Sequence, residues 1–441
     1  MPERDTTPTW PGVWMWAGMI FQKIFLNIWG SDKSYYNYLK KFRKQLSKTK
    51  HFNKILIVVD INIGDAILLQ SCAESIRQYF PGSQIDYLCN YLGGRLLSGL
   101  PHVNNVYNVV KGGGIPSADD LDRVEEVITE NNYDLILNLS PFVMKKSLQH
   151  GGNVIQLYVL LTAYIMKLWR RNENRMHISY LTRTFFDDFL NPSNDNISKN
   201  IFDIFEKPSS TKYGGNVVYL PHNAVQEANE FLKKNNIYPM DRIVLFNPDA
   251  TVKFSMIPFG IQIQVLKNLL ESDDIDYVLI SKAYSNPGIE KNILISLASE
   301  LNRKIIIVPH MPLMTFTALI DLCNVFLTGD TGPLHIAASW KEPLDNNDHL
   351  RNSTAVISVI GATDSRMFCY DSSKPGHVPA NQFAPSKVFI GEAPCRNITC
   401  LNKTGKTCNE VRCFNNIDPD KISSYIISYL QTLTTSFRKI G

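Results

Sequence analysis

Four consecutive residues, Asp-Thr-Gly-Pro at 330–333, and the nearby His335 form the part of the sequence best suited to chemistry. They lie between an apolar run at 324–327 and a helical pattern at 334–340. A strand that ends near a glycine and continues as a helix with proline in its first turn leaves backbone N–H groups without intrahelical partners. Such groups bind anions, and a histidine in that turn can donate to a phosphate oxygen. A plain helix start with a structural histidine also fits the pattern. The predicted phosphate-binding residues are Asp330, Thr331, Gly332 and His335.

A second loop with suitable residues runs from Asn247 to Lys253, directly after the predicted strand 242–246. Its asparagine and proline end the strand, so Lys253 extends from the same carboxyl-end edge of the sheet as Thr331. A lysine is a compact positive charge that pairs well with a diphosphate. We expect Lys253 and Thr251 to contact the phosphorylated ligand, the alternative being a solvated loop.

The third candidate is Asp65, which ends the Ile-Gly-Asp sequence at 63–65. It follows the first predicted strand and opens the first helix, at the end of the sheet where open α/β folds bind their ligands. A carboxylate there can act as a general base. Aspartate also caps helices well and glycine makes the turn, so a structural role fits the same residues.

The composition limits the architecture and the class of partner. At 441 residues the chain is too long for one ordinary core, so two domains and an extra segment are expected. With 45 basic and 41 acidic residues, the formal charge of +4 creates no global field that would attract nucleic acid. The 44% hydrophobic content is typical of a globular protein. We therefore expect no nucleic-acid partner.

Alternating strand and helix patterns from Lys54 onward predict an α/β protein. The first series has strands at 55–60, 84–90, 106–110 and 133–139 and helices at 66–80 and 119–131. A looser, helical segment follows at 151–210. The second series has strands at 216–220, 242–246, 276–281, 304–308, 324–327 and 354–360, with helices between them and a last helix from 418 to about 437. This order predicts two Rossmann-like, doubly wound domains that face each other across a cleft.

The first fifty residues differ from the rest in their pattern of apolar and basic residues. The stretch 13–29 is apolar apart from three polar residues on one helix face, and 31–50 is rich in lysine and arginine with one acid, Asp32. An apolar helix followed by a basic segment suits an anionic membrane surface. If the helix spans the bilayer, the basic flank puts the rest of the chain in the cytoplasm. A helix packed on the protein's own core is the alternative.

These motifs resemble glycosyltransferase family 9, the heptosyltransferase family of lipopolysaccharide core assembly. The resemblance covers about residues 54–430 and is carried most specifically by Gly-Asp-Thr-Gly-Pro-Leu-His at 329–335. It implies the GT-B fold and an inverting, metal-independent transfer of a sugar from a nucleotide diphosphate, typically ADP-heptose, with no cofactor. The other matching stretches are the strand and Ile-Gly-Asp at 55–65, Asn-Pro…Lys at 247–253, and Ile-Gly-Ala-Thr-Asp at 360–364.

The resemblance also implies roles for the motif residues. Asp65 would accept the proton of the acceptor hydroxyl as it attacks the anomeric carbon from the face opposite the leaving group. Preorganised donors and a helix end can stabilise the charge that develops on that leaving group, in place of a metal ion. The residues that would hold the donor are Thr251, Lys253, Asp330, Thr331, Gly332 and His335.

The implied domains are a possible membrane attachment at 1–50, an acceptor domain at 51–210, a nucleotide-sugar domain at 211–415 and a C-terminal helix at 416–441. Two stretches depart from the family pattern. Residues 280–283 replace a Gly-rich, acid-bearing turn, which leaves the nucleoside open, and residues 254–258 replace a Trp-Pro sequence.

Two groups of residues have side chains that could bind a metal ion. Asp274 and Asp276 precede a strand, at the end of the sheet away from the expected ligands, and are interpreted as solvated surface. The cysteines at 395, 400, 408 and 413 crowd into one loop with wider spacing than standard zinc knuckles, so a metal, free thiols and disulfides all stay open. The isolated cysteines, expected to be buried and reduced, are Cys72, Cys89, Cys323 and Cys369.

Together the motifs and the resemblance predict a glycosyltransferase associated with the cytoplasmic face of the inner membrane. Its partners would be a nucleotide-sugar and a glycan or glycolipid acceptor such as lipopolysaccharide core. A nucleotide-sugar epimerase or hydrolase of the same shape would need further acid or base groups, which the sequence does not reveal. A non-catalytic sugar-nucleotide binding protein is a third possibility, against which Asp65 argues.

Overall fold

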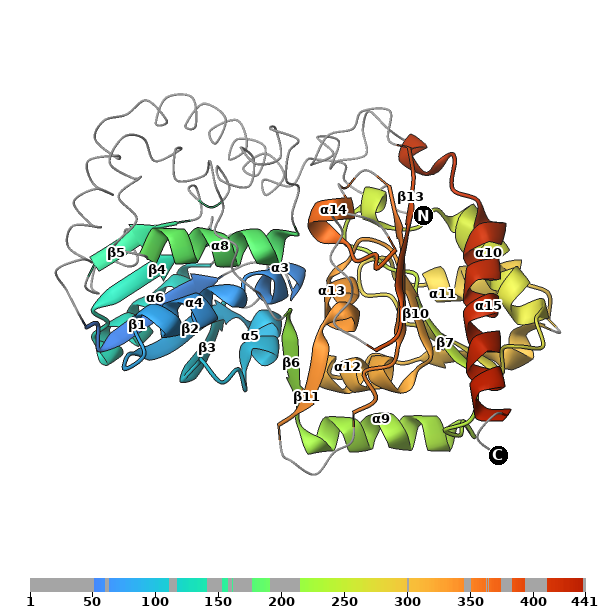
Figure 1. Cartoon of the computed structure of the whole chain (residues 1–441), viewed down its shortest axis with the longest axis horizontal. Coiled ribbons are helices and arrows are strands. Elements are labelled where there is room, and N and C mark those ends of the chain that lie inside the picture. Colours follow the sequence, from blue (N-terminus) through green and yellow to red (C-terminus); the bar gives the residue numbers. More distant parts are fainter. Residues whose placement is uncertain are drawn as a thin grey trace. The chain divides into compact units, whose positions relative to one another are not determined.

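The computed structural model describes residues 51–59, 63–110, 117–140, 153–157, 161, 177–190, 215–299, 301–344, 350–361, 363, 365–373, 383–392 and 411–438. The chain divides into two compact units, Met1–Arg175 with Ser179–Gly214, and Met176–Ile178 with Gly215–Gly441. Each unit is built on its own parallel sheet (Figure 1). The predicted N-terminal segment lies outside the described residues. None of the described helices is long and apolar enough to cross a bilayer.

Unit 1 contains a five-stranded parallel sheet in the order β3-β2-β1-β4-β5. The buried strands are short apolar runs, as parallel strands covered on both faces require. Hydrogen bonds from Ser71 and Ser75 to backbone carbonyls of α8 tie α4 to that helix. Its elements are β1 (Lys54–Val59), α3 (Ile63–Leu68), α4 (Ser71–Tyr79), β2 (Gln84–Asn90), α5 (Tyr91–Leu97), β3 (Asn105–Val110), α6 (Ala118–Asn131), β4 (Leu135–Asn138), β5 (Asn153–Gln156) and α8 (Ile178–Leu190).

Unit 2 contains a six-stranded parallel sheet in the order β13-β12-β10-β7-β8-β9, and a separate pair formed by β11 and β6. Its strands are β6 (Val217–Leu220), β7 (Ile243–Asn247), β8 (Tyr277–Ser281), β9 (Ile305–Val308), β10 (Val325–Thr328), β11 (Trp340–Pro343), β12 (Ala355–Ile360) and β13 (Ser386–Ile390). Its α-helices are α9 (His222–Lys234), α10 (Phe259–Glu271), α11 (Ile289–Ser296), α12 (Leu313–Leu322), α13 (Gly332–Ala338), α14 (Ser365–Phe368) and α15 (Pro419–Arg438). Short 3-10 turns lie at Lys253–Ser255, Leu301–Lys304 and Arg412–Phe414.

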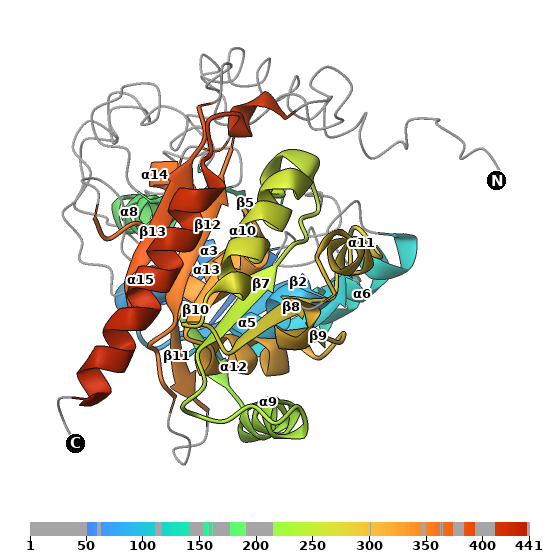
Figure 2. The same cartoon turned by 90° about the vertical axis from the view of Figure 1, so that its right-hand side faces the viewer.

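The two faces of the unit 2 sheet bury alternate residues of each strand, as the strand period of two requires. Val244 and Phe246 of β7 point into one core together with residues of α10, α11 and α15. Figure 2 shows α10 and α15 side by side over this face. On the other face, Phe326 of β10 meets Phe316 of α12 edge to face, with ring centroids 6.5 Å apart. The alternation thus accounts for a three-layer unit.

The α/β class with parallel sheets is confirmed, and several element predictions were wrong. The predicted helix 66–80 is two helices, α3 and α4, which meet in a turn at residues 69 and 70. Strand β6 pairs with β11 outside the main sheet, and β11 begins at Trp340, which was predicted to be helical. Strand β5 occupies residues predicted to be helical, and β13 was not predicted. The errors about strands concern those at the edges of the sheets and in the short β6–β11 pair, where long-range contacts override local sequence patterns.

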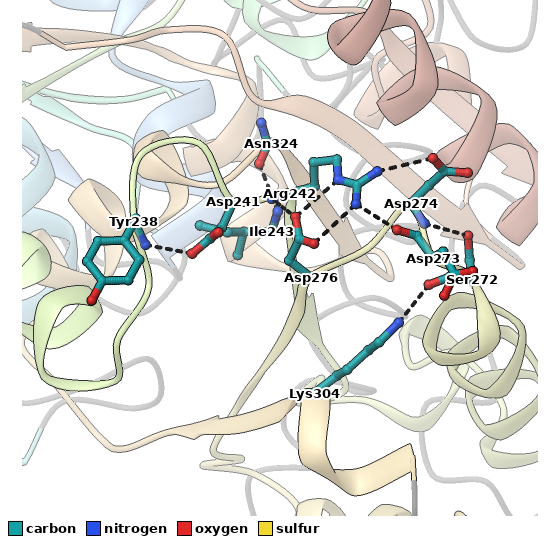
Figure 3. Close-up of polar contacts among 10 residues, drawn as sticks. All are labelled: Tyr238, Asp241, Arg242, Ile243, Ser272, Asp273, Asp274, Asp276, Lys304 and Asn324. Carbon is teal, nitrogen blue, oxygen red and sulfur yellow. Dashed lines mark hydrogen bonds and ion pairs between the residues drawn. The ribbon is translucent and has the colours of Figure 1, made fainter.

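Arg242 joins the two aspartates that had been interpreted as solvated surface (Figure 3). Its backbone N–H and Nε donate to Asp276 Oδ2 at 2.7 and 3.0 Å, and its Nη1 donates to Asp274 Oδ1 at 3.1 Å. Burial opposes ionisation of Asp276, but the bonds from Arg242 outweigh it and lower the pKa of that carboxyl. The location of both aspartates before β8, at the amino end of the sheet, is confirmed. Their interpretation as merely solvated is corrected, because they form an ion-pair network that fixes the starts of β7 and β8.

Replacing Arg242 by methionine is expected to lower the free energy of unfolding by about 1–2 kcal/mol, because a bidentate, partly buried guanidinium pair is lost. Nucleotide binding should be unchanged, since Arg242 lies at the opposite end of the sheet from the candidate site. Urea unfolding measures the first effect and calorimetry the second. Lys267→Met serves as the control. Its ion pair with Glu271 is 3.9 Å long and more than half exposed, so we expect a change below about 0.5 kcal/mol. Equal effects in both variants would contradict the account.

Candidate functional site

The junction between β10 and α13 is built as the sequence predicted, with a strand, a tight loop and a helix that has proline in its first turn. Thr331 is the residue before the helix and has extended backbone angles, φ −138° and ψ 164°. Its side chain makes no capping bond, because its hydroxyl turns to the Thr328 hydroxyl at 3.1 Å. The start of α13 is therefore not capped by its own threonine, and Thr331 and Gly332 are only partly buried.

Asn247, at the end of β7, connects the neighbouring strand ends. Its Nδ2 donates to the Thr328 hydroxyl at 3.0 Å, and its Oδ1 accepts from the Ser281 hydroxyl at 3.0 Å. The side chain thus crosses the carboxyl ends of β7, β10 and β8. The sequence suggested only that Asn247 ends a strand, since partners so distant in sequence leave no local signal.

The loop after β7 lies directly against Gly329. A Cβ built on Gly329 would fall 2.1 Å from the carbonyl oxygen of Ser255. The same carbonyl accepts a hydrogen bond from the Asp330 N–H at 3.0 Å. Only glycine allows this approach, which brings the loop bearing Lys253 next to the loop bearing Asp330.

Asp330 is held on a second side by Thr363, which follows β12. Its carboxylate accepts a short hydrogen bond from the hydroxyl of Thr363. Burial raises the pKa of the Asp330 carboxyl, and the bond from Thr363 acts in the opposite direction. Thr363 belongs to the Ile-Gly-Ala-Thr-Asp stretch at 360–364, which resembles the family pattern. The sequence did not predict its bond to Asp330. The arrangement fits Asp330 as a residue that shapes the loop.

Lys253 and Thr251 lie exposed on the loop after β7, two and four residues before Ser255. Asp249 organises the next loop along the sheet, because its Oδ2 accepts from the N–H groups of Tyr284 and Ser285 at 2.8 and 2.7 Å. Residues 280–283, which differ from the family pattern, thus lead into a loop that is held by Asp249 from the end of β7. Asp249 was not among the predicted site residues.

The His335 ring lies in the interior of unit 2. The residue is 5% exposed, and its Nδ1 lies 3.1 Å from the hydroxyl of Tyr370. Burial lowers the pKa of His335 to about 4 and raises that of Tyr370, so both are neutral near pH 7. The structure therefore shows a contact that supports α13, and the predicted bond from His335 to a phosphate stays a prediction.

Burial of His335 is expected to make stability pH-dependent. Its pKa falls from 6.5 to about 4 on folding, so in this window the unfolded chain binds a proton that the folded chain does not. Above the unfolded pKa both states are neutral at His335, and the free energy of unfolding is not reduced. As the pH falls, the unfolded chain gains the proton first, so the free energy of unfolding decreases by roughly 2 kcal/mol between about pH 7.5 and about pH 5. Urea unfolding at both pH values should show that this decrease in the free energy of unfolding is smaller in His335→Gln than in wild type, by roughly 2 kcal/mol. Equal losses would contradict the assignment.

A buried lysine supports the far end of α13. Lys341 is 1% exposed, and its Nζ donates to the carbonyls of Ala337 and Ser339 at 2.6 and 2.7 Å. Burial lowers its pKa to about 7. The lysine thus satisfies carbonyls that the end of a helix leaves without partners. The sequence around Lys341, Ser-Trp-Lys-Glu-Pro at 339–343, gives no signal that this lysine is buried or of its partners.

In unit 1, Asp65 lies in the first turn of α3, where the sequence placed it. It is partly exposed, while Gly64 and Ala66 on either side are buried. Its backbone carbonyl accepts from the Leu69 N–H at 2.9 Å. Asp65 is therefore a partly exposed residue at the carboxyl-end edge of the unit 1 sheet. The predicted donor residues all belong to unit 2.

Five cysteines lie in the described part of the chain, and all five are buried free thiols. Cys72, Cys89, Cys323 and Cys369 are buried thiols without disulfides, as predicted. Cys413 is also buried, with its Sγ against Gly361, and the other three cysteines of that loop lie outside the described residues. Across the described segments no group of three or more histidine, cysteine, aspartate or glutamate side chains could hold a metal ion.

Comparison with known proteins gives one family match and several structural matches. The model of glycosyltransferase family 9 (heptosyltransferase) matches residues 220–344, which include β7, β10 and α13. No curated protein sequence matches the chain.

Two solved structures share the fold. The glycosyl transferase family 9 protein from Veillonella parvula DSM 2008 is 15% identical with a TM-score of 0.57, covering 86% of this chain and 98% of that one. ADP-heptose lps heptosyltransferase II from E. coli is 15% identical with a TM-score of 0.53, covering 86% and 99%. The GT-B fold is thus confirmed. The family match and the shared fold together confirm the resemblance to glycosyltransferase family 9 and support a glycosyltransferase.

Proposed function

We propose that the protein transfers a sugar, heptose or a related one, from a nucleotide diphosphate to a lipid-linked or surface glycan such as lipopolysaccharide core. The observation that carries the proposal is the packing of the family-matched loops of unit 2. Gly329 lies against Ser255, and Asn247 joins three strand ends around Thr331. These contacts hold the partly exposed start of α13 and the Lys253 loop together, as a diphosphate site needs.

In the proposed reaction the acceptor hydroxyl attacks the anomeric carbon and gives its proton to the Asp65 carboxylate. A new carbon–oxygen bond forms as the bond to the diphosphate oxygen breaks, and the diphosphate leaves with the electron pair. Attack from the opposite face inverts the anomeric configuration. Lys253 and the Thr331 and Gly332 N–H groups stabilise the charge on the leaving diphosphate, so a metal ion is not required.

The nucleoside would lie against the loop that Asp249 holds at the end of β8. Tyr284 in this loop is 69% exposed, and its ring centroid lies 4.1 Å from that of His310, which follows β9. An exposed aromatic surface suits a planar base. The heptosyltransferase from E. coli that shares the fold is described as using ADP-heptose, which makes ADP-heptose the first donor to test.

The acceptor part of the proposal includes the membrane. The apolar and basic residues at 1–50 suit attachment to the cytoplasmic face of the inner membrane, where a lipid-linked acceptor would be found. Deleting 1–50 is expected to move the protein from the membrane to the soluble fraction. Unchanged partitioning would contradict this part of the proposal.

The proposal is tested by incubating the purified protein with ADP-, GDP- and UDP-sugars and lipid-linked glycan acceptors, with and without EDTA. Mass spectrometry detects a product that is heavier than the acceptor by one sugar, and NMR assigns its anomeric configuration. We expect one donor class to be used, with inversion, and the rate to persist in EDTA. Retention of configuration, or loss of activity in EDTA that a divalent ion restores, would contradict the mechanism.

A further inference from the structure

The first turn of α5 exposes two large apolar side chains at the edge of the unit 1 sheet. Tyr91 is 52% exposed and Leu92 is 46% exposed. Helix α5 begins directly after β2, so this turn lies at the same carboxyl-end edge as α3, which carries Asp65. Figure 1 shows the two helices together at one end of the sheet. Tyr91 and Leu92 therefore present an exposed apolar surface on the helix that packs against α3.

The backbone of this turn is fixed by two glycines. A Cβ on Gly93 would lie 3.2 Å from the Cβ of Ala66, the residue after Asp65. A Cβ on Gly94 would lie 1.5 Å from Oδ1 of Asn108, so a larger residue there would have to displace the Asn108 side chain. The side chain of Asn90 also accepts a hydrogen bond from the Gly93 N–H at 2.8 Å. Helix α5 therefore packs closely against α3 and β3, and this packing positions its exposed first turn.

One face of the Tyr91 ring carries a cation. The guanidinium carbon of Arg95, one turn later, lies 4.9 Å from the ring centroid. Within the described ranges no carboxylate pairs with Arg95, so none of the described acids competes with an anionic ligand for its guanidinium. The ring and Leu92 offer an apolar surface beside this charge. A sugar ring with an anionic substituent matches both, because its C–H face packs on an aromatic ring and its phosphate or carboxylate pairs with a guanidinium.

We propose that Tyr91, Leu92 and Arg95 form an acceptor subsite, which binds a ring of the glycan that carries a phosphate or carboxylate. The subsite holds the glycan while Asp65, on the adjoining helix, takes the proton of the reacting hydroxyl. This inference rests on the proposed function. It assigns the acceptor rather than the donor, because the family-matched segment 220–344 lies in unit 2.

The test is steady-state kinetics of Tyr91→Ala, Tyr91→Phe and Arg95→Gln with the acceptor that wild type glycosylates. Tyr91→Ala should raise the KM for the acceptor about tenfold, which corresponds to the loss of one aromatic contact, and leave kcat and the donor KM within about twofold. Tyr91→Phe keeps the ring and should behave as wild type. Arg95→Gln should raise the acceptor KM and weaken its dependence on salt. Tyr238→Ala, which removes a ring 61% exposed in unit 2, is the matched control and should change nothing.

The outcomes separate this inference from the proposed function. An unchanged acceptor KM in Tyr91→Ala and Arg95→Gln, with an active wild type, overturns the subsite and leaves the function intact. A fall in kcat alone also overturns it, because binding would be unaffected. If wild type transfers no sugar to any acceptor, the proposed function fails. Calorimetric titration of the same acceptors then tests the subsite. Acceptor binding that is weaker in Tyr91→Ala than in wild type supports the subsite. No acceptor binding by wild type overturns it.

Discussion

Replacing Asp65 by asparagine is expected to lower kcat by about 10²–10⁴, the usual contribution of a general base. Asparagine has nearly the same shape but cannot accept the proton of the attacking hydroxyl. Donor affinity should be unchanged, since the residues proposed to hold the donor belong to unit 2 and Asp65 belongs to unit 1. Initial rates at saturating donor and acceptor give kcat, and calorimetry with the nucleoside diphosphate gives the affinity.

Asp119→Asn is the control for this experiment. Asp119 is an exposed acid in the first turn of α6, in the same unit and the same kind of helix position as Asp65. Its replacement should leave kcat unchanged, which separates the loss of a base from the loss of a charge at a helix start. Full activity in Asp65→Asn would remove Asp65 from the mechanism.

Replacing Gly329 by alanine is expected to damage both stability and donor binding. The new Cβ would lie 2.1 Å from the Ser255 carbonyl oxygen, so the loop after β7 must move away from the loop after β10. Overpacking of this kind costs about 1–3 kcal/mol. Because the movement separates Lys253 from Thr331 and Gly332, we also expect nucleoside diphosphate affinity to fall at least about tenfold. Urea unfolding and calorimetry measure the two effects.

The matched control is Gly260→Ala, since nothing lies within 4 Å of a Cβ built on Gly260. This residue is exposed in the first turn of α10, where alanine favours the helix, so stability should rise by up to about 1 kcal/mol. Donor affinity should not change. If Gly329→Ala bound the nucleotide as wild type does, the close packing of the two loops would have no part in donor binding.

Local patterns predicted the strand ends that position the candidate site. The buried runs of β1, β7 and β10 are bounded by residues that cannot continue a strand, and this placed Asp65, Lys253 and Thr331 at carboxyl ends. Which strands pair is not encoded locally. The run at 217–220 looks like any central strand, yet among the described strands it pairs only with β11.

The environment of His335 shows a second limit of sequence reasoning. The bond from His335 to a phosphate oxygen stays a prediction, but the contact between His335 and Tyr370 was not predicted. Residues 334–338 are all buried, so α13 is enclosed and its histidine lies against the Tyr370 hydroxyl. The apolar residues around His335 were a signal of burial, because a helix that is hydrophobic all round is buried. The partner Tyr370 depends on tertiary packing, as do the partners of Asn247 and Lys341.

The most direct test of the central claim is a stoichiometric balance of the reaction. After turnover of a nucleotide-sugar with an acceptor, chromatography quantifies the nucleoside diphosphate released and mass spectrometry quantifies the acceptor that has gained a sugar. The account predicts equal amounts of both, and neither product in Asp65→Asn above a small residual rate. Release of nucleoside diphosphate with free sugar and no heavier acceptor, or conversion of the donor into an isomer, would contradict a glycosyltransferase.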